Sequence, residues 1–166
     1  PQALQHLLSK KEQPAQEIRR GEADFPYKSE LKTTSNAEWD TAIDEFLRFE
    51  SSNQLSNRRA AADFELGGQA YPAGTLLTLC IGAANRDPAV FERPNQLNLS
   101  RSPNKHLAFG FGIHRCVGNR LAELQLKILW EEILKRFDHI EVLDEPERVP
   151  SAFVRGYKSM MVRIPA

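Results

Sequence analysis

Cysteine is scarce in this chain of 166 residues, in which only Cys80 and Cys116 occur. Two cysteines are too few for a disulfide scaffold, and no Cys-x-x-Cys pair is present for zinc binding or thioredoxin-like redox chemistry. No apolar run approaches the roughly 18 to 20 residues that span a bilayer, and the first residues lack the pattern of a signal peptide. We therefore expect a cytoplasmic protein with no membrane partner.

Excess charge of either sign is also missing, because 22 Lys and Arg residues balance 22 Asp and Glu residues. The chain thus has no overall field that would attract nucleic acid, and we expect no nucleic-acid partner. Its 41% hydrophobic and 27% charged residues are typical of a globular protein with one core. A single domain is the simplest prediction for this length.

Two well-marked helices are predicted behind an irregular lead-in. Residues 1–35 combine a short helical stretch with a polar, charge-rich connection. A capping box at residues 35–38 then starts a helix over residues 36–49 that has one apolar face. Residues 117–137 have the broadest apolar stripe in the chain, which predicts a core helix packed on more than one side.

Strand patterns are short and lie between these helices and at the end of the chain. Alternating apolar residues and a turn at 71–74 predict a small antiparallel sheet over residues 59–81. Prolines divide residues 86–108 into turns, and long irregular connections of this kind are often functional. Residues 153–164 predict a terminal hairpin around Gly156. The fold class is therefore mainly α with small antiparallel β-sheets.

The residues with the clearest chemistry form a glycine-rich loop directly before the long helix. Cys116 lies where this loop meets the helix start, and the partial positive charge of a helix N-terminus favours a thiolate over a thiol. Glycines allow a flat macrocycle to approach the backbone, and phenylalanines supply apolar cover. The glycines are Gly110, Gly112 and Gly118, and the phenylalanines are Phe109 and Phe111.

Cys116 has other interpretations, of which the simplest is a small buried structural residue. A dinucleotide-binding loop would need glycine at position 115, where Arg115 stands. A phosphatase-like loop would need arginine at position 122, where Ala122 stands. A cysteine protease normally takes its base from a distant part of the sequence, whereas His114 is nearly adjacent. These three loops fail on spacing, and a structural cysteine stays open on the residues alone.

The loop contains the full pattern Phe-x-x-Gly-x-x-x-Cys-x-Gly, as Phe109, Gly112, Cys116 and Gly118. With this pattern the chain resembles the cytochrome P450 family, and the following residues are similar to soluble bacterial alkane and fatty-acid hydroxylases. The resemblance covers residues 36–166. It implies that the whole chain, residues 1–166, is the C-terminal half of the cytochrome P450 fold. It also implies heme b (haem b, iron protoporphyrin IX) as the cofactor and Cys116 as the iron ligand.

The resemblance assigns a second motif, Glu-x-x-Arg, to Glu45 and Arg48 on the first predicted helix. Three residues apart, these side chains share a helix face, and alone they would be an ordinary surface ion pair worth roughly 0.2–0.5 kcal/mol. The family adds an arginine in the connection 86–108, which Arg101 matches. The implied role of the three charges is to hold this connection in place.

Further cofactor contacts are implied by position in the family motifs. Arg58 and His114 are expected to pair with the haem propionates, with Arg59 as an alternative to Arg58. The contacts expected from the loop are Phe109, Gly110 and Gly118.

Substrate contacts are expected from Phe153 and Val154 in the terminal hairpin, and from Leu55 after the first helix. Residues 51–55 lack the proline that the family usually has there, which leaves the shape of this strand open. Oxygen-activating residues lie on an upstream helix in family members. No catalytic residue is therefore assigned in this chain.

The implied function is a haem-thiolate monooxygenase that inserts one oxygen atom from O₂ into a small apolar substrate, with electrons from a ferredoxin or a reductase. Two interpretations of three cations near the loop have equal weight: a docking patch for an acidic electron donor, or ordinary solvated residues. The cations are Arg115, Arg120 and Lys127. The alternative function is a truncated, non-catalytic haem-binding or interaction module. Because family members are more than twice as long, we expect the chain to be a fragment of a longer protein, with a natural truncation as the alternative. We expect its apolar surfaces to bind the missing N-terminal half or a second copy.

Overall fold

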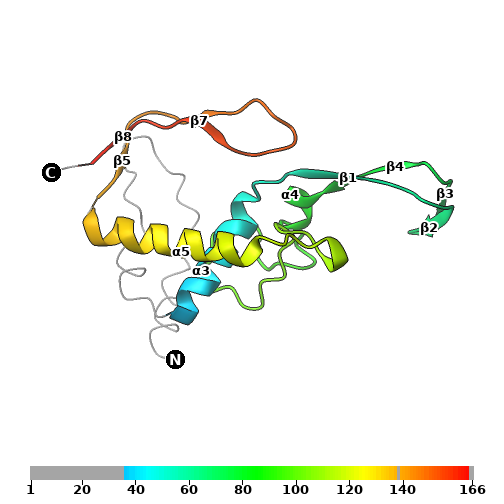
Figure 1. Cartoon of the computed structure of the whole chain (residues 1–166), viewed down its shortest axis with the longest axis horizontal. Helices are drawn as coiled ribbons and strands as arrows, with labels where there is room; N and C mark the ends of the chain where they lie inside the picture. Colours follow the sequence, from blue (N-terminus) through cyan, green and yellow to red (C-terminus); the bar gives the residue numbers. More distant parts are fainter. Residues whose placement is uncertain (1–35, 138, 165–166) are drawn as a thin grey trace.

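The computed structural model describes residues 36–137 and 139–164, so the lead-in expected over residues 1–35 lies outside the described residues. Two helices form the centre of the described chain (Figure 1). Helix α3 spans Asn36–Glu50 and helix α5 spans Asn119–Arg136. The two helices pack against each other, and they provide the frame that positions the loops.

The hydrophobic core lies between α3 and α5. Trp39, Ala42 and Ile43 are buried on one face of α3, at the three- and four-residue spacing of a helix face. Leu134 of α5 is buried against them. The half-buried apolar neighbours are Phe46, Leu47, Leu99, Leu126 and Trp130. The predicted first helix is confirmed, and it ends one residue later than the sequence pattern indicates.

Helix α5 differs from its prediction in two ways. It begins at Asn119, two residues later than predicted, because Gly118 is its N-cap. Its stripe is also partly uncovered, since four apolar side chains are between 50% and 61% exposed. These are Leu121, Leu124, Ile128 and Leu129. The expected packing on more than one side is therefore wrong within the described part of the chain, where α3 packs against α5 and leaves this stripe exposed.

Four strands lie between α3 and α5 in the sequence. Strand β1 (Leu55–Arg59) pairs antiparallel with β4 (Leu76–Cys80), and β2 (Phe64–Leu66) pairs antiparallel with β3 (Gln69–Tyr71). The single sheet expected over residues 59–81 is therefore two separate two-stranded sheets. Strand β1 escapes the sequence pattern because its residues, LSNRR, are mostly polar and exposed. Figure 1 shows the β2–β3 hairpin at the far end of the β1–β4 ribbon.

Four short strands form the C-terminal arm: β5 (Glu141–Val142), β6 (Glu147–Arg148), β7 (Tyr157–Ser159) and β8 (Val162–Arg163). Strand β5 pairs with β8, and β6 pairs with β7. The predicted hairpin within residues 153–164 is therefore wrong, because its strands pair with residues 141–148. The Gly156 carbonyl accepts the Val149 N–H at 3.0 Å, so the chain reverses before Gly156 and not around it.

The connection before α5 is irregular, as predicted. It follows the short helix α4 (Ile81–Ala84) and ends in the 3₁₀ turn η2 (Gly112–His114). Among the described helices, none is long and apolar enough to cross a membrane.

Candidate functional site

A buried charge cluster, formed by Glu45, Arg48 and Arg101, joins α3 to the connection 86–108. The Glu45 and Arg48 side chains are fully buried, and that of Arg101 is 8% exposed. Arg48 binds Glu45 through two bonds of 2.8 Å, from Nε to Oε2 and from Nη2 to Oε1. Arg101 Nε donates to Oε2 of Glu45 at 3.0 Å. The structure thus brings the three motif residues together in the interior and not as a surface pair.

The charge cluster also binds the backbone of the connection. Arg48 and Arg101 donate to carbonyl oxygens, and Glu45 accepts a backbone N–H, at distances of 2.8–2.9 Å. The carbonyls belong to Asn85, Pro94 and Glu92, and the N–H belongs to Asn98. Buried charges need such partners, because desolvation without them is costly. A segment that has little regular structure is thereby fixed to α3.

A tight loop runs from Phe109 to Cys116, and we call it the Cys116 loop. The Cys116 N–H donates to the Phe109 carbonyl at 2.9 Å, which closes the loop. Inside it, the Arg115 N–H donates to the Gly112 carbonyl at 3.0 Å. Gly110 and Gly112 have φ angles of 70° and 73°. This left-handed conformation is unfavourable for residues other than glycine. The two glycines therefore allow the loop to fold back on itself.

The Cys116 side chain is exposed and has exposed apolar neighbours along the chain. Phe111, Ile113 and Val117 are each at least 85% exposed. The Cys116 carbonyl accepts the Asn119 N–H at 3.4 Å, so the residue lies just before the first turn of α5. An exposed thiol at a helix start, with exposed apolar residues before and after it in the sequence, fits a thiolate-ligated, flat apolar macrocycle such as haem.

Replacing Gly112 with alanine tests the shape of the Cys116 loop. An added Cβ would meet no heavy atom within 4 Å, so the expected cost comes from the left-handed backbone alone. We expect the free energy of unfolding to fall by about 1–2 kcal/mol, measured by urea unfolding. Gly156→Ala is the control, because the Gly156 backbone is not left-handed and its added Cβ would make only a 4.0 Å contact. Equal losses in the two variants would contradict the prediction.

Strand β1 separates the two arginines considered for a haem propionate. Arg58 and Arg59 lie on opposite faces, because side chains alternate along a strand. Arg59 Nη1 donates to the Gly74 carbonyl at 2.8 Å, whereas Arg58 Nη1 donates within its own strand, to Ser56 Oγ at 3.0 Å. His114 is exposed at the end of η2. The pairing of Arg58 with a propionate, or of Arg59 in its place, therefore stays a prediction.

The three residues expected to contact substrate lie at one edge of the molecule. The Gln54 N–H donates to the Phe153 carbonyl at 3.0 Å, and an antiparallel bridge joins Asn53 to Val154. Leu55 follows directly as the first residue of β1. Phe153 is 60% exposed, so this edge presents apolar surface. The proline-free segment before β1 is irregular apart from the isolated bridge at Asn53, and the regular strand begins at Leu55.

Two arginines, Arg86 and Arg155, contact the C-terminal end of α3 beside this edge. Arg86 donates to the Phe49 carbonyl at 2.7 Å, and its guanidinium lies 4.5 Å from the centroid of the Phe49 ring. Burial lowers the pKa of Arg86, and the positive charges of Arg155 and Arg48 act in the same direction. Arg155 Nε lies 3.3 Å from the Glu50 carboxylate. An arginine stays protonated at neutral pH, so the ion pair of Arg155 with Glu50 links the C-terminal loop to α3.

The cations considered for donor docking have contacts within the chain. Arg120 Nη1 lies 3.0 Å from the Glu123 carboxylate, and Lys127 Nζ lies 3.9 Å from that of Asp40. Arg115 is exposed in the Cys116 loop. Carboxylates therefore offset two of the three charges of the expected patch.

Two polar residues that contact the segment before the Cys116 loop have no site role predicted from the sequence. Asn85 is fully buried, and the His106 side chain is 7% exposed. No spacing rule indicates them, because their partners lie far away in the sequence. Only the tertiary structure shows that both contact the segment before Phe109.

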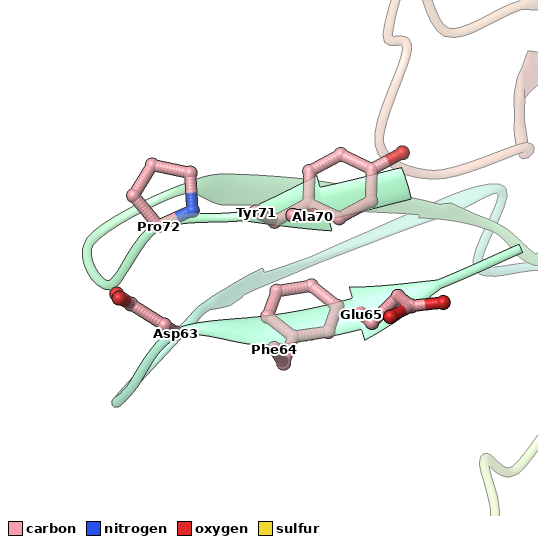
Figure 2. A pocket seen from close by; sticks show the side chains of 6 residues that line it. All are labelled: Asp63, Phe64, Glu65, Ala70, Tyr71 and Pro72. Atoms are coloured by element: carbon pink, nitrogen blue, oxygen red, sulfur yellow. The ribbon is translucent and has the colours of Figure 1, made fainter. Parts of the chain in front are cut away.

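A surface pocket lies on the β2–β3 hairpin (Figure 2). Its lining residues are Asp63, Phe64, Glu65, Ala70, Tyr71 and Pro72. The Phe64 and Tyr71 rings stack at 5.1 Å, and Asp63 Oδ1 accepts the Ala73 N–H at 2.7 Å. These contacts stabilise the hairpin, and none of the predicted site residues lines the pocket.

Comparison with known proteins identifies curated relatives of this chain. Polyketide biosynthesis cytochrome P450 PksS of Bacillus subtilis (strain 168) is 42% identical over 128 residues, which are 75% of this chain and 32% of that protein. Beta-dihydromenaquinone-9 omega-hydroxylase of Mycobacterium bovis is 38% identical over 142 residues, 86% of this chain and 29% of that protein. The chain thus spans about a third of the length of these relatives.

Solved structures and a family model agree with these relatives. The structure of Cytochrome P450-153 from Novosphingobium aromaticivorans matches with a TM-score of 0.77 and 42% identity, over 85% of this chain and 36% of that chain. The predicted fold class is therefore confirmed. The family model described as Cytochrome P450 matches residues 39–163. The chain belongs to the cytochrome P450 family.

Proposed function

We propose that this chain, residues 1–166, is the C-terminal, haem-binding part of a haem-thiolate monooxygenase, with the Cys116 thiolate as the iron ligand. Membership of the family implies a haem cofactor, and we propose haem b. The observation that carries the proposal is the Cys116 loop, which presents one exposed thiol beside exposed apolar side chains, just before α5.

The residues of the chain would bind and orient the cofactor. The loop backbone holds the sulfur, while Phe109, Gly110 and Gly118 would contact the macrocycle. Arg58 and His114 would offset the propionate charges. When bound, a thiolate-ligated haem supplies dioxygen activation, because the thiolate donates electron density that favours O–O cleavage.

We propose a small apolar substrate that contacts Leu55, Phe153 and Val154. Support comes from the apolar edge where these residues meet. A second support, for the apolar character of the substrate and not for its size, is the name of one relative, an omega-hydroxylase of beta-dihydromenaquinone-9. We do not assign the oxygen-activating residues to this chain.

The electron donor in this proposal is a ferredoxin or a reductase, and the remaining part of a family-length protein, or a second copy, covers the apolar face of α5. Support for the covering comes from the four half-exposed apolar residues of that helix. The comparisons do not favour the non-catalytic module, since the named relatives include a hydroxylase. The cytoplasmic setting stays a prediction.

The absorption spectrum of the reduced, carbon-monoxide-treated protein tests the iron ligand. We expect the red-shifted Soret band of thiolate ligation, and we expect Cys116→Ala to abolish it completely, since no thiolate then reaches the iron. Cys80→Ala is the matched control, because Cys80 is also an exposed free cysteine but lies at the end of β4. A band that is unshifted in the parent protein, or that persists in Cys116→Ala, would overturn the assignment.

A further inference from the structure

The segment that leads into the Cys116 loop is bound by two side chains from outside the loop. The Leu107 N–H donates to Asn85 Oδ1 at 2.7 Å, and the Ala108 N–H donates to His106 Nδ1 at 3.2 Å. The Leu107 carbonyl in turn accepts the Gly110 N–H at 2.9 Å. Two consecutive backbone amides are therefore fixed immediately before the loop begins.

Asn85 connects this segment to the end of α3. Its side chain is fully buried, and Nδ2 donates to Ser51 Oγ at 2.8 Å. The Ser51 hydroxyl donates to the Arg48 carbonyl at 2.8 Å. Ser51 has a φ of 43°, a strained conformation for a residue other than glycine, so its surroundings must hold it there. Through Asn85, the C-terminus of α3 and the Leu107 amide share one chain of hydrogen bonds.

His106 makes a second connection to α3. Because Nδ1 accepts the Ala108 N–H, the neutral ring has its proton on Nε2, which lies 3.4 Å from Asp44 Oδ1. The ring centroid is 6.2 Å from that of Phe109, the first residue of the Cys116 loop. Asp44 thus orients the ring, and the ring holds the backbone next to the loop.

The charge cluster does not replace these two contacts. Within the described residues, the hydrogen bonds of Glu45, Arg48 and Arg101 reach no further along the chain than Asn104. The segment from residue 105 to the loop therefore needs other contacts to hold it against α3. Asn85 and His106 supply them.

We propose that Asn85 and His106 are positioning residues that hold the start of the Cys116 loop against α3 and so set the place of the Cys116 sulfur. The inference rests on the proposed iron ligation by Cys116. Neither side chain is expected to touch the iron or the substrate. Their effect passes through the Leu107 and Ala108 amides to the loop.

Four variants of the intact protein test this inference. His106→Phe keeps a ring but loses both nitrogens, whereas His106→Asn places an amide oxygen where Nδ1 accepted the Ala108 N–H. Asn85→Leu keeps the branched side-chain shape and the number of heavy atoms and loses both hydrogen bonds. Asp63→Leu is the control, because it removes a side-chain bond to a backbone N–H of the same 2.7 Å length, in the β2–β3 hairpin.

Two measurements read the result. In His106→Phe and Asn85→Leu, hydrogen exchange at the Ala108 and Leu107 amides, respectively, is expected to rise about tenfold, as the loss of about 1.4 kcal/mol would give. The same variants should convert part of the red-shifted carbon-monoxide band to the unshifted band. His106→Asn should retain the parent exchange rate and spectrum, and Asp63→Leu should change neither.

The outcomes separate this inference from the ligand assignment. Unchanged exchange and an unchanged band in both His106→Phe and Asn85→Leu would overturn the positioning role, even if Cys116→Ala abolishes the band. A loss of exchange protection and of the red-shifted band in His106→Asn as large as that in His106→Phe would also contradict the positioning role. The hydrogen-bond acceptor for the Ala108 N–H would then have no effect. If the band persists in Cys116→Ala, the proposed ligation fails, and with it the role of these residues in placing an iron ligand. The exchange rates would still report whether they hold the loop.

Discussion

Replacing Glu45 with glutamine is expected to lower the free energy of unfolding by about 3–5 kcal/mol. The Glu45 carboxylate accepts bonds from both guanidinium groups of the charge cluster, and the Arg48 and Arg101 side chains are 0% and 8% exposed. A neutral amide would leave two positive charges buried without a counter-charge. Such a loss is a large fraction of the 5–15 kcal/mol that is typical of a whole domain.

Urea unfolding of the parent and variant measures this loss. Glu132→Gln is the matched control, because the Glu132 carboxylate contacts Lys135 and Arg136 on the exposed surface of α5. The pKa of Glu132 is lowered chiefly by the hydrogen bond from Lys135 and next by the one from Arg136. Solvent screens these exposed charges, so the interactions contribute little to stability. We expect the control to change the unfolding midpoint far less. Similar shifts in the two variants would show that the burial of the cluster is energetically unimportant.

Replacing Trp39 with alanine is the second change with a large expected effect, also about 3–5 kcal/mol in the free energy of unfolding. Trp39 is 3% exposed and packs with Ala42, Ile43 and Leu134 where α3 meets α5. Truncation to alanine removes the largest side chain of this small core and leaves a cavity between the helices. The packing of α3 against the C-terminal half of α5, around Leu134, would therefore weaken.

Thermal or urea unfolding measures the effect of Trp39→Ala. Unfolding is monitored by far-UV circular dichroism, because the substitution changes the tryptophan fluorescence. Leu66→Ala serves as the control, because Leu66 is 62% exposed on the β2–β3 hairpin and its truncation should cost less than about 0.5 kcal/mol. A loss below about 1 kcal/mol for Trp39→Ala would mean that the described core contributes little to stability.

The local features of this protein follow from short stretches of sequence. The apolar period of residues 36–49 predicts α3, and the glycines of residues 109–118 predict a tight loop before a helix. Both follow from geometry that a few neighbouring residues determine, namely the helical repeat and the left-handed freedom of glycine. The motif around Cys116 extends over ten positions, so the sequence also indicates the family.

Pairing across long distances was harder to predict. Strand β1 is polar and has no alternation, so the sheet boundaries were misplaced. Strands β7 and β8, after Gly156, pair with β6 and β5, before residue 149. Strands β5 and β6 have two residues each, which is too short for a periodic pattern in the sequence. The exposure of the α5 stripe also depends on what covers the helix, which the apolar period alone does not contain.

The sequence by itself determined the two main helices, the Cys116 loop and the residues of the charge cluster. Only the tertiary structure decided that Glu45 and Arg48 are buried, and that Asn85 and His106 contact the segment before the loop. The physical reason is separation along the chain: His106 and Asp44 are 62 positions apart, and Asn85 and Leu107 are 22 apart. Periodicity and turn chemistry describe neighbours, whereas such contacts form only when packing brings distant segments within hydrogen-bonding distance.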